Sequence, residues 1–216
     1  MEWSVNPERN VKHPFIKLAV TDICPEDVAS FFRLQREPPL LHRVLLEVDK
    51  QELPGHLVSL LADYELACGY GFENEALVRP CLDAILLTTL ATHKRQQLDL
   101  LGEDPASYES GSIKSLDFQF EKHIKLAWTY NKEKYIVTGT MDYSLWYGCP
   151  PVRECNLVVI EAKSLSESGR CEALAYMAML LHARKFAGRS DTVMHGIATN
   201  GNRWEFVRID AQSQMR

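Results

Sequence analysis

The stretch NLVVIEAKS, residues 156–164, decides the fold because it contains the most strand-like run in the sequence. Its apolar residues, 157–160, predict a central strand that is buried until its last turn. The run stops abruptly at Glu161, Ala162 and Lys163. Burying a charge costs free energy unless the charge is paired, so a buried strand gains nothing from ending in an acid and a base. The two charges therefore need a functional explanation.

A second stretch, GTMDYSLWYG at residues 139–148, predicts another strand. Successive side chains of a strand point to opposite faces, so the alternation here predicts one solvated face and one packed face. The solvated face comprises Thr138, Thr140, Asp142 and Ser144, and the packed face comprises Val137, Met141, Tyr143 and Leu145. The sequence thus predicts that Asp142 is accessible on the solvated side.

The two stretches together predict a cluster of charged groups. Glu161 and Lys163 share one face of their strand by the same alternation. If the two strands are neighbours in one sheet, Asp142, Glu161 and Lys163 converge within a few ångströms. Two carboxylates with a backbone carbonyl beside them, here that of Ala162, form a hard oxygen site that suits Mg²⁺ or Mn²⁺. A lysine next to such a site can orient or deprotonate an attacking water, which is what phosphodiester hydrolysis requires.

The rest of the chain predicts a mixed α/β protein. Before residue 70, helical spacing of apolar residues predicts three short helices. After a glycine turn come a longer helix, three β-rich runs and a helix that ends at Gly188. Two strands then pair across an Asn200-Gly201 turn. The predicted order after residue 70 is helix, three strands, helix, two strands.

The N-terminal segment carries many apolar side chains. We expect it to pack on the remainder of the chain or on a second copy of itself, which would make a homodimer, because such stripes are not left in water. The side chains concerned are Phe31, Phe32, Leu45, Leu46, Leu60 and Leu61.

Composition narrows the setting. The chain has 216 residues, of which 46% are hydrophobic, enough for one domain with a real core. Its six cysteines include no CxxC pair, and the first residues lack the layout of a signal peptide. No apolar run approaches the roughly 20 residues of a membrane span. These features predict an intracellular protein, cytoplasmic or nuclear. A formal charge of −5 argues against binding nucleic acid through overall charge, so any such site must be local.

The order of elements, with Asp142 on one strand and Glu161-Ala162-Lys163 ending the next, resembles the PD-(D/E)xK nuclease superfamily. The resemblance covers roughly residues 72–210, and EALAYMAMLLHARK and GIATNGNRWEFVRID are similar to a largely uncharacterised fungal branch of that superfamily. It implies a restriction-endonuclease-like core at residues 71–216, with a mixed central sheet flanked by helices. Residues 1–70 would be an α-helical N-terminal extension.

The resemblance also implies roles for individual residues. Asp142 and Glu161 would bind Mg²⁺ or Mn²⁺, together with the carbonyl of Ala162, and Lys163 would be the catalytic lysine. In many members an acid on the first core helix completes the metal site, and Glu75 is the matching candidate. The proline that names the motif is replaced here by Met141. The implied activity is hydrolysis of DNA or RNA phosphodiester bonds.

Other interpretations remain open at this point. The acid-x-lysine motif is short, and Glu161 and Lys163 also fit an exposed ion pair at a strand end. Glu75 also fits a first-turn acid favoured by the helix dipole. Three basic residues flank the second core helix and are candidates for a nucleic-acid path, although they also fit a solvated helix face: Arg170, Arg184 and Lys185. The fold could equally serve as a catalytically silent module that binds a protein or a nucleic acid.

Overall fold

The structure is a computed structural model that describes residues 15–36, 52–69, 75–101, 116–147, 154–162, 168–189, 192–201 and 203–215. Within these ranges, only the backbone is described at residues 75–77, 101, 147, 154–162 and 168. The predicted helix around residues 38–50 and the residue Lys163 lie outside the described part of the chain.

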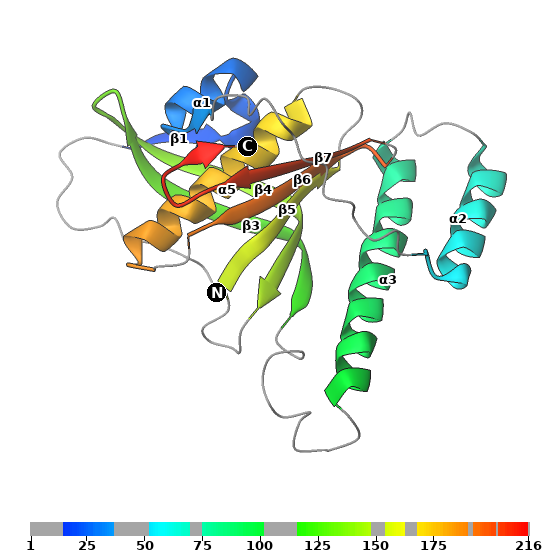
Figure 1. Ribbon diagram of the computed structural model, residues 1–216. Helices are drawn as coiled ribbons and strands as arrows, with labels where there is room; N and C mark the ends of the chain where they lie inside the picture. Colours follow the sequence, from blue (N-terminus) through cyan, green and yellow to red (C-terminus); the bar gives the residue numbers. More distant parts are fainter. Residues whose placement is uncertain are drawn as a thin grey trace.

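One mixed sheet forms the centre of the described structure (Figure 1). Its order is β1 (Ile16–Ala19), β4 (Glu133–Tyr147), β5 (Glu154–Ala162), β6 (Met194–Thr199), β7 (Trp204–Ile209), β8 (Gln214–Met215) and β2 (Gln35–Arg36), with β3 (Asp117–Tyr130) paired to β4. Strands β3, β4 and β5 form an antiparallel meander, whereas β5 and β6 are parallel. The sheet is therefore mixed, as the sequence predicts.

The described helices are α1 (Val28–Phe31), α2 (Gly55–Cys68), α3 (Glu75–Leu101) and α5 (Ser168–Phe186), with two short 3-10 turns, η1 (Val20–Asp22) and η2 (Pro25–Asp27). Parallel strands need a crossover connection, and α5 supplies the crossover between β5 and β6. From α3 onward the elements occur in the predicted order, which confirms a mixed α/β chain. A nuclease-like core within this class stays a prediction. None of the helices in the described ranges is both long and apolar enough to span a membrane.

The N-terminal segment differs from the prediction of an all-helical extension. Residues 16–36 contain two strands, two 3-10 turns and a helix of a single turn. Strand β1 pairs in parallel with residues 135–138 of β4, and β2 pairs in parallel with β8. Phe31 and Phe32, two of the apolar residues that suggested a helix, are buried, and they pack in the core with α5 and with aromatic residues of β3 and β4. The helical description is therefore wrong for β1 and β2 and confirmed for α1 and α2, while a boundary near residue 70 stays a prediction.

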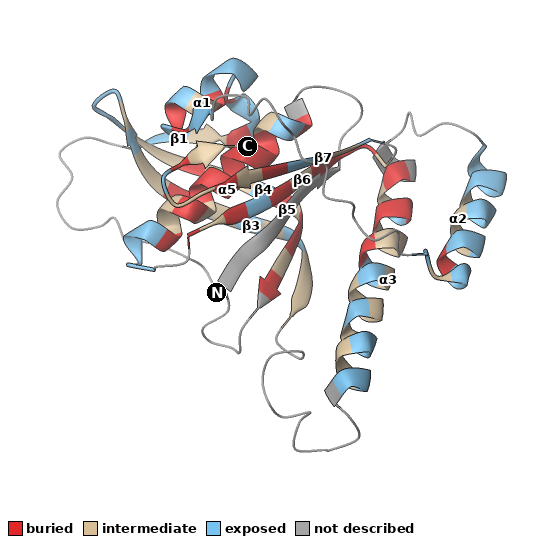
Figure 2. Ribbon diagram, in the orientation of Figure 1, coloured by how far each residue is buried: buried red, intermediate tan, exposed pale blue. Residues whose placement is uncertain are grey.

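Helices α5 and α3 cover opposite faces of the sheet. A Cβ atom added at Gly196 of β6 would collide with Met177 of α5. The next residue, Ile197, packs against the cluster formed by Val78, Leu82 and Leu86 of α3. Because neighbouring strand residues point to opposite faces, α5 and α3 must lie on different sides. Figure 2 shows that α5 is buried along most of its length, whereas α3 is buried mainly in its N-terminal half.

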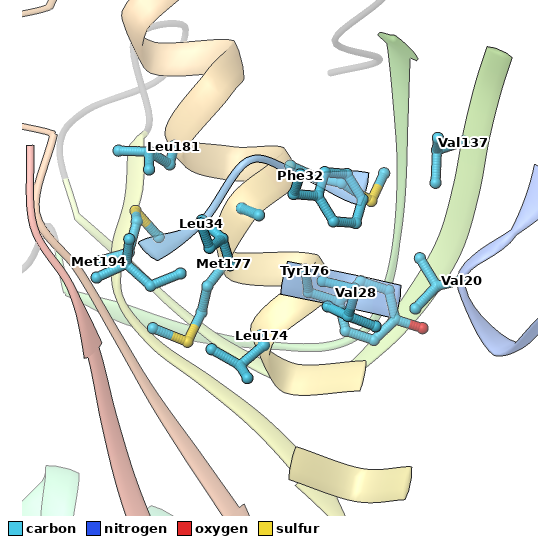
Figure 3. Packing of buried hydrophobic residues seen from close by; sticks show 14 of the residues in the cluster. Val20, Val28, Phe32, Leu34, Val137, Leu174, Tyr176, Met177, Leu181 and Met194 are labelled. Carbon is cyan, nitrogen blue, oxygen red and sulfur yellow. The ribbon is translucent and has the colours of Figure 1, made fainter. Parts of the chain in front are cut away.

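The larger core lies between α5, the sheet and the N-terminal segment (Figure 3). Met177 and Leu181 of α5 meet Phe32 and Val28 of the N-terminal segment in this cluster. The indole of Trp128 donates a 2.8 Å hydrogen bond to the carbonyl of Phe31, which ties β3 to α1. The segment before β2 is therefore an integral part of the main core.

This integration predicts a large effect of a core substitution near the N-terminus. Phe32 is fully buried, so Phe32→Ala should lower the free energy of unfolding by about 3 to 5 kcal/mol, because it removes apolar burial and leaves a cavity. Leu66 of α2 is 86% exposed, so Leu66→Ala should change it by about 0.5 kcal/mol or less. Urea unfolding of both variants measures the difference. Equal effects would mean that Phe32 does not contribute to the core.

Burial of His182 predicts a pH dependence of stability. Its Nε2 lies 3.1 Å from the carbonyl of Phe32, to which it donates, and its ring lies 4.3 Å from that of Trp128. Burial lowers the pKa of His182, and the positive charges of Lys185 and Arg33 act in the same direction, whereas the bond to Phe32 opposes them. As pH falls below about 6.5, the unfolded chain takes up a proton before the folded chain does, so the folded state loses stability.

The variant His182→Gln keeps a side-chain donor for the Phe32 carbonyl and does not titrate. We expect its unfolding free energy to fall less than that of the wild type between about pH 7 and pH 5. Chemical denaturation at several pH values measures the two slopes. Identical slopes would show that His182 does not produce this dependence.

Candidate active site

The register of the sheet brings Asp142 and Glu161 to adjacent strands. Tyr143 pairs with Ile160 and Ser144 pairs with Val159 in the antiparallel ladder of β4 and β5. Asp142 precedes Tyr143 and Glu161 follows Ile160, so the two acids lie next to the same pair of residues on adjacent strands. On its other side Glu161 pairs with Ala198 of β6. The backbone positions of the two predicted metal-binding acids are thus neighbours, and the side chain of Glu161 lies outside the description.

The other two predicted metal ligands also have defined backbone positions. Ala162, whose carbonyl is a predicted ligand, follows Glu161 and pairs with Thr199. Glu75, the predicted helical acid, is the first residue of α3. Lys163 lies just beyond the last described residue of β5.

The alternation of β4 breaks at Asp142. Val137 and Met141 pack in the core beside α5, as predicted for one face. Tyr143 is two residues after Met141, so regular alternation would place it on the same face. It packs instead against Val78 and Leu82 of α3, on the opposite side of the sheet. The prediction that Met141 and Tyr143 share a face is therefore wrong.

A matching break occurs in β3, at the position opposite Asp142. Regular alternation would place Phe118, Ile124 and Leu126 on one face of β3. Phe118 packs with the α3 cluster, however, while Ile124 and Leu126 belong to the α5 core. Between them, Glu121 has a φ of +49°, a left-handed conformation that is uncommon for a residue with a side chain. The paired register runs unbroken on both sides of Glu121, so the hairpin changes faces without losing alignment. Such backbone strain persists only where the surroundings enforce it.

The predicted solvated face is also covered at Ser144. Ser144 is fully buried, and its Oγ accepts a 2.7 Å hydrogen bond from the indole of Trp146. Its hydroxyl also contacts the carbonyl of Gln119 at 3.4 Å. The burial of Trp146 at the end of β4 thus encloses a serine that the alternation places in solvent. Thr140, by contrast, is exposed as predicted.

The guanidinium of Arg79, on α3, joins the two acids at the break. Its Nη2 donates to Oδ1 of Asp142 at 2.6 Å, and its Nη1 donates to Oε1 of Glu121 at 3.2 Å. The Asp142 side chain is only 12% exposed, whereas that of Glu121 is 69% exposed. Because screening by water weakens exposed ion pairs, the bond to Asp142 is the stronger of the two.

Arg79 also fixes the orientation of α3 relative to the acids. Residues four apart lie on one face of a helix, so Glu75, Arg79 and Asp83 form a single stripe. Arg79 contacts Asp142, and Asp83 lies close enough to Tyr143 to raise the pKa of its hydroxyl. Burial, followed by Asp83, raises this pKa, which keeps the hydroxyl protonated. The stripe therefore faces the end of β4, and the backbone of Glu75 lies one turn before Arg79 on that face.

The donor set fits a divalent cation in chemical type. Oxygen atoms of carboxylates are the ligands that Mg²⁺ and Mn²⁺ prefer. One oxygen of Asp142 already has the Arg79 guanidinium 2.6 Å away, so a cation that binds this oxygen has to displace the guanidinium. Among the side chains that the structure describes, no group of three His, Cys, Asp or Glu residues is arranged to hold a metal. The side chains of Glu75 and Glu161 lie outside the described part of the structure.

The three predicted nucleic-acid contacts have different settings. Arg170, in the first turn of α5, is exposed and lies 4.0 Å from Glu205. Lys185 is exposed and donates a 2.9 Å hydrogen bond to Oγ of Ser213. Arg184 is only 6% exposed and points its Nη1 at Sδ of Met194. The structure contradicts the assignment of Arg184 to a nucleic-acid path because a buried guanidinium cannot reach a phosphate.

Sequence reasoning missed Arg79 and Glu121. A signal for Arg79 was present, because Glu75, Arg79 and Asp83 are charged residues at four-residue spacing on an otherwise apolar part of a helix. Glu121 gave no comparable signal. The apolar and polar residues on each side of it still alternate regularly in the sequence, so nothing there indicates a left-handed backbone.

The chain matches no protein-family model, and no curated protein matches it. The family resemblance therefore rests on the order of elements and on the residues named above.

The geometry at Arg79 predicts unequal coupling to its two acids. A double-mutant cycle with Arg79→Met and Asp142→Asn should give a coupling free energy of about 1 to 3 kcal/mol, because the pair is short and the Asp142 side chain is only 12% exposed. The cycle of Arg79→Met with Glu121→Gln is the matched control and should give about 0.5 kcal/mol or less. Denaturant unfolding of the single and double variants supplies both values. A larger coupling to Glu121 would contradict this ranking.

Proposed function

We propose that this chain is a metal-dependent nuclease that hydrolyses phosphodiester bonds of DNA or RNA. The observation that carries the proposal is the register of β4 and β5, which makes the backbones of Asp142 and Glu161 neighbours at the end of a central strand. An acid-x-lysine motif at that point of the fold is more informative than the same three residues elsewhere. The topology of α3, the β3–β5 meander, α5 and β6 is consistent with the proposal.

Each residue has a role in the proposed reaction. Asp142, Glu161 and the carbonyl of Ala162 would hold Mg²⁺ or Mn²⁺, with Glu75 as a further ligand from α3. When bound, the metal would lower the pKa of water and neutralise charge that develops on the phosphate oxygens. Lys163 would orient the attacking water or take its proton.

The surroundings of the proposed site also suit a charged substrate. Arg170 is exposed near β7 and could contact a phosphate of the chain, and Lys185 is a weaker candidate because it is already bonded to Ser213. Nothing in this arrangement favours DNA over RNA, so the proposal includes both.

A second function has one observation in its favour. The guanidinium of Arg79 already neutralises Asp142, and an acid with a built-in counter-ion does not need a metal for stability. A catalytically silent module of this fold, which binds a protein or a nucleic acid, would retain such a pair. The two functions differ in one measurable property: the nuclease cleaves nucleic acid in the presence of Mn²⁺, and the silent module does not.

A cleavage assay tests the nuclease proposal. Labelled single- and double-stranded DNA and RNA oligonucleotides should be cut in the presence of Mn²⁺ and left intact with a chelator. Lys163→Met should slow single-turnover cleavage about 10²- to 10⁴-fold, since it removes the group that activates or positions the water. Asp142→Asn should also lose cleavage, because the metal site loses a charged ligand.

Lys17→Met, at an exposed position of β1 that is assigned no role in the site, serves as the control for loss of a positive charge. If this variant cleaves at the wild-type rate and Lys163→Met loses cleavage, the assigned role of Lys163 is supported. Cleavage by Lys163→Met at the wild-type rate would reduce Lys163 to a strand-end charge. Absence of metal-dependent cleavage by the wild-type protein on all four substrates would favour the silent module.

A further inference from the structure

Arg79 occupies the place at Asp142 that a divalent cation would need. Its Nη2 lies 2.6 Å from Oδ1, within the range of a strong charge-assisted hydrogen bond. A metal ion coordinated by the same carboxylate would repel the guanidinium strongly at such a separation. The two cations therefore compete for one acid, and both cannot keep their closest contact with it.

The pair is accessible enough to exchange. The Arg79 side chain is 35% exposed, and its second acid, Glu121, faces water. Pro80 follows Arg79 inside α3, and proline has no backbone N–H to bond to the preceding turn. The turn that contains Arg79 is therefore held to the rest of the helix by one hydrogen bond fewer than usual.

The charge of this cluster becomes less negative when a divalent cation binds. Asp142 and Glu121 together with Arg79 carry one net negative charge, which repels a phosphodiester, and the proposed ligands Glu75 and Glu161 add to it. A divalent cation bound at Asp142 adds two positive charges and so weakens this repulsion. A guanidinium released from Asp142 would then be close to the metal and available for an anion, and its planar fork matches the geometry of phosphate oxygens.

We propose that Arg79 exchanges partners during the proposed reaction: it is the counter-ion of Asp142 before metal binds, and it holds a phosphate of the nucleic-acid substrate afterwards. This inference rests on the proposed nuclease function. It explains why a nuclease would place an arginine against its metal-binding acid, since the pair keeps substrate out until the metal is in place.

The first test measures metal binding without any cleavage. Mn²⁺ affinity is determined by calorimetry for wild type, Arg79→Met, Arg79→Lys and the control Arg203→Met. Arg203 forms an ion pair of the same 2.6 Å length with Glu205, and neither residue is assigned a role at the metal site. We expect Arg79→Met to bind Mn²⁺ about tenfold more tightly or better, because no ion pair has to be broken, and Arg203→Met to match the wild type.

The second test measures substrate binding. Each arginine variant is combined with Lys163→Met so that labelled DNA and RNA oligonucleotides stay intact in Mn²⁺. Arg79→Met should weaken oligonucleotide binding about tenfold despite its tighter hold on the metal. Arg79→Lys should fall in between, because it keeps the charge but loses the fork.

The outcomes separate this proposal from the function on which it rests. Wild-type cleavage with unchanged Mn²⁺ affinity in Arg79→Met would overturn the exchange and leave the nuclease standing. Tighter Mn²⁺ binding with unchanged oligonucleotide binding would also overturn it, since the released guanidinium would then not contact phosphate. An equal gain in affinity in Arg203→Met would make the effect one of general charge and overturn it as well. Absence of Mn²⁺ binding in all the proteins would reject both proposals.

Discussion

The structure depends on one constraint: the single long hairpin formed by β3 and β4 contributes side chains to two separate cores. Strand β4 has 15 residues, and its first half packs beside α5 while its last part packs beside α3. A regular strand presents one face to one side throughout, so the hairpin must change faces somewhere. It does so at Glu121 and Asp142, where two acids come together and a guanidinium from α3 lies across them. The break thus creates both the second core and the charged cluster.

Strand pairing along β4 shows why the break occurs at this point. The edge opposite β3 pairs first with β1, through residues 135–138, and later with β5, from Tyr143 onward. Asp142 lies at the junction between these two partners. On the β1 side, the core is filled by the N-terminal segment and α5, and on the β5 side, α3 takes over. A polar residue at the junction avoids burial in either core.

Much of this architecture could be predicted from the sequence. The apolar run before Glu161, the Asn200-Gly201 turn and the glycine that ends α5 are local signals, and the elements that they indicate are present. The strands β1 and β2 could not be predicted in this way, because each is short and forms only by pairing with a strand more than 100 residues away. Tertiary pairing overrides helical spacing there. The face change at Asp142 could not be predicted for a related reason. The rule that side chains alternate between faces assumes that no residue in the strand has a left-handed backbone.

The candidate site was predictable to the extent that it follows from strand register. Adjacent strands with Asp142 and Glu161 at matching positions follow from alternation and connection length alone, but the partner of Asp142 comes from a helix more than 60 residues earlier in the chain. That partner matters for the choice between the two functions. A fully buried ion pair would be too costly to separate, whereas Asp142 and Arg79 retain 12% and 35% of their exposure. Water can therefore reach both groups, and a hydrated cation can approach Asp142 by the same route. Complete enclosure between α3 and β4 would add the desolvation cost of both charges and would hold the two groups together, so the residual exposure is what allows the pair to open.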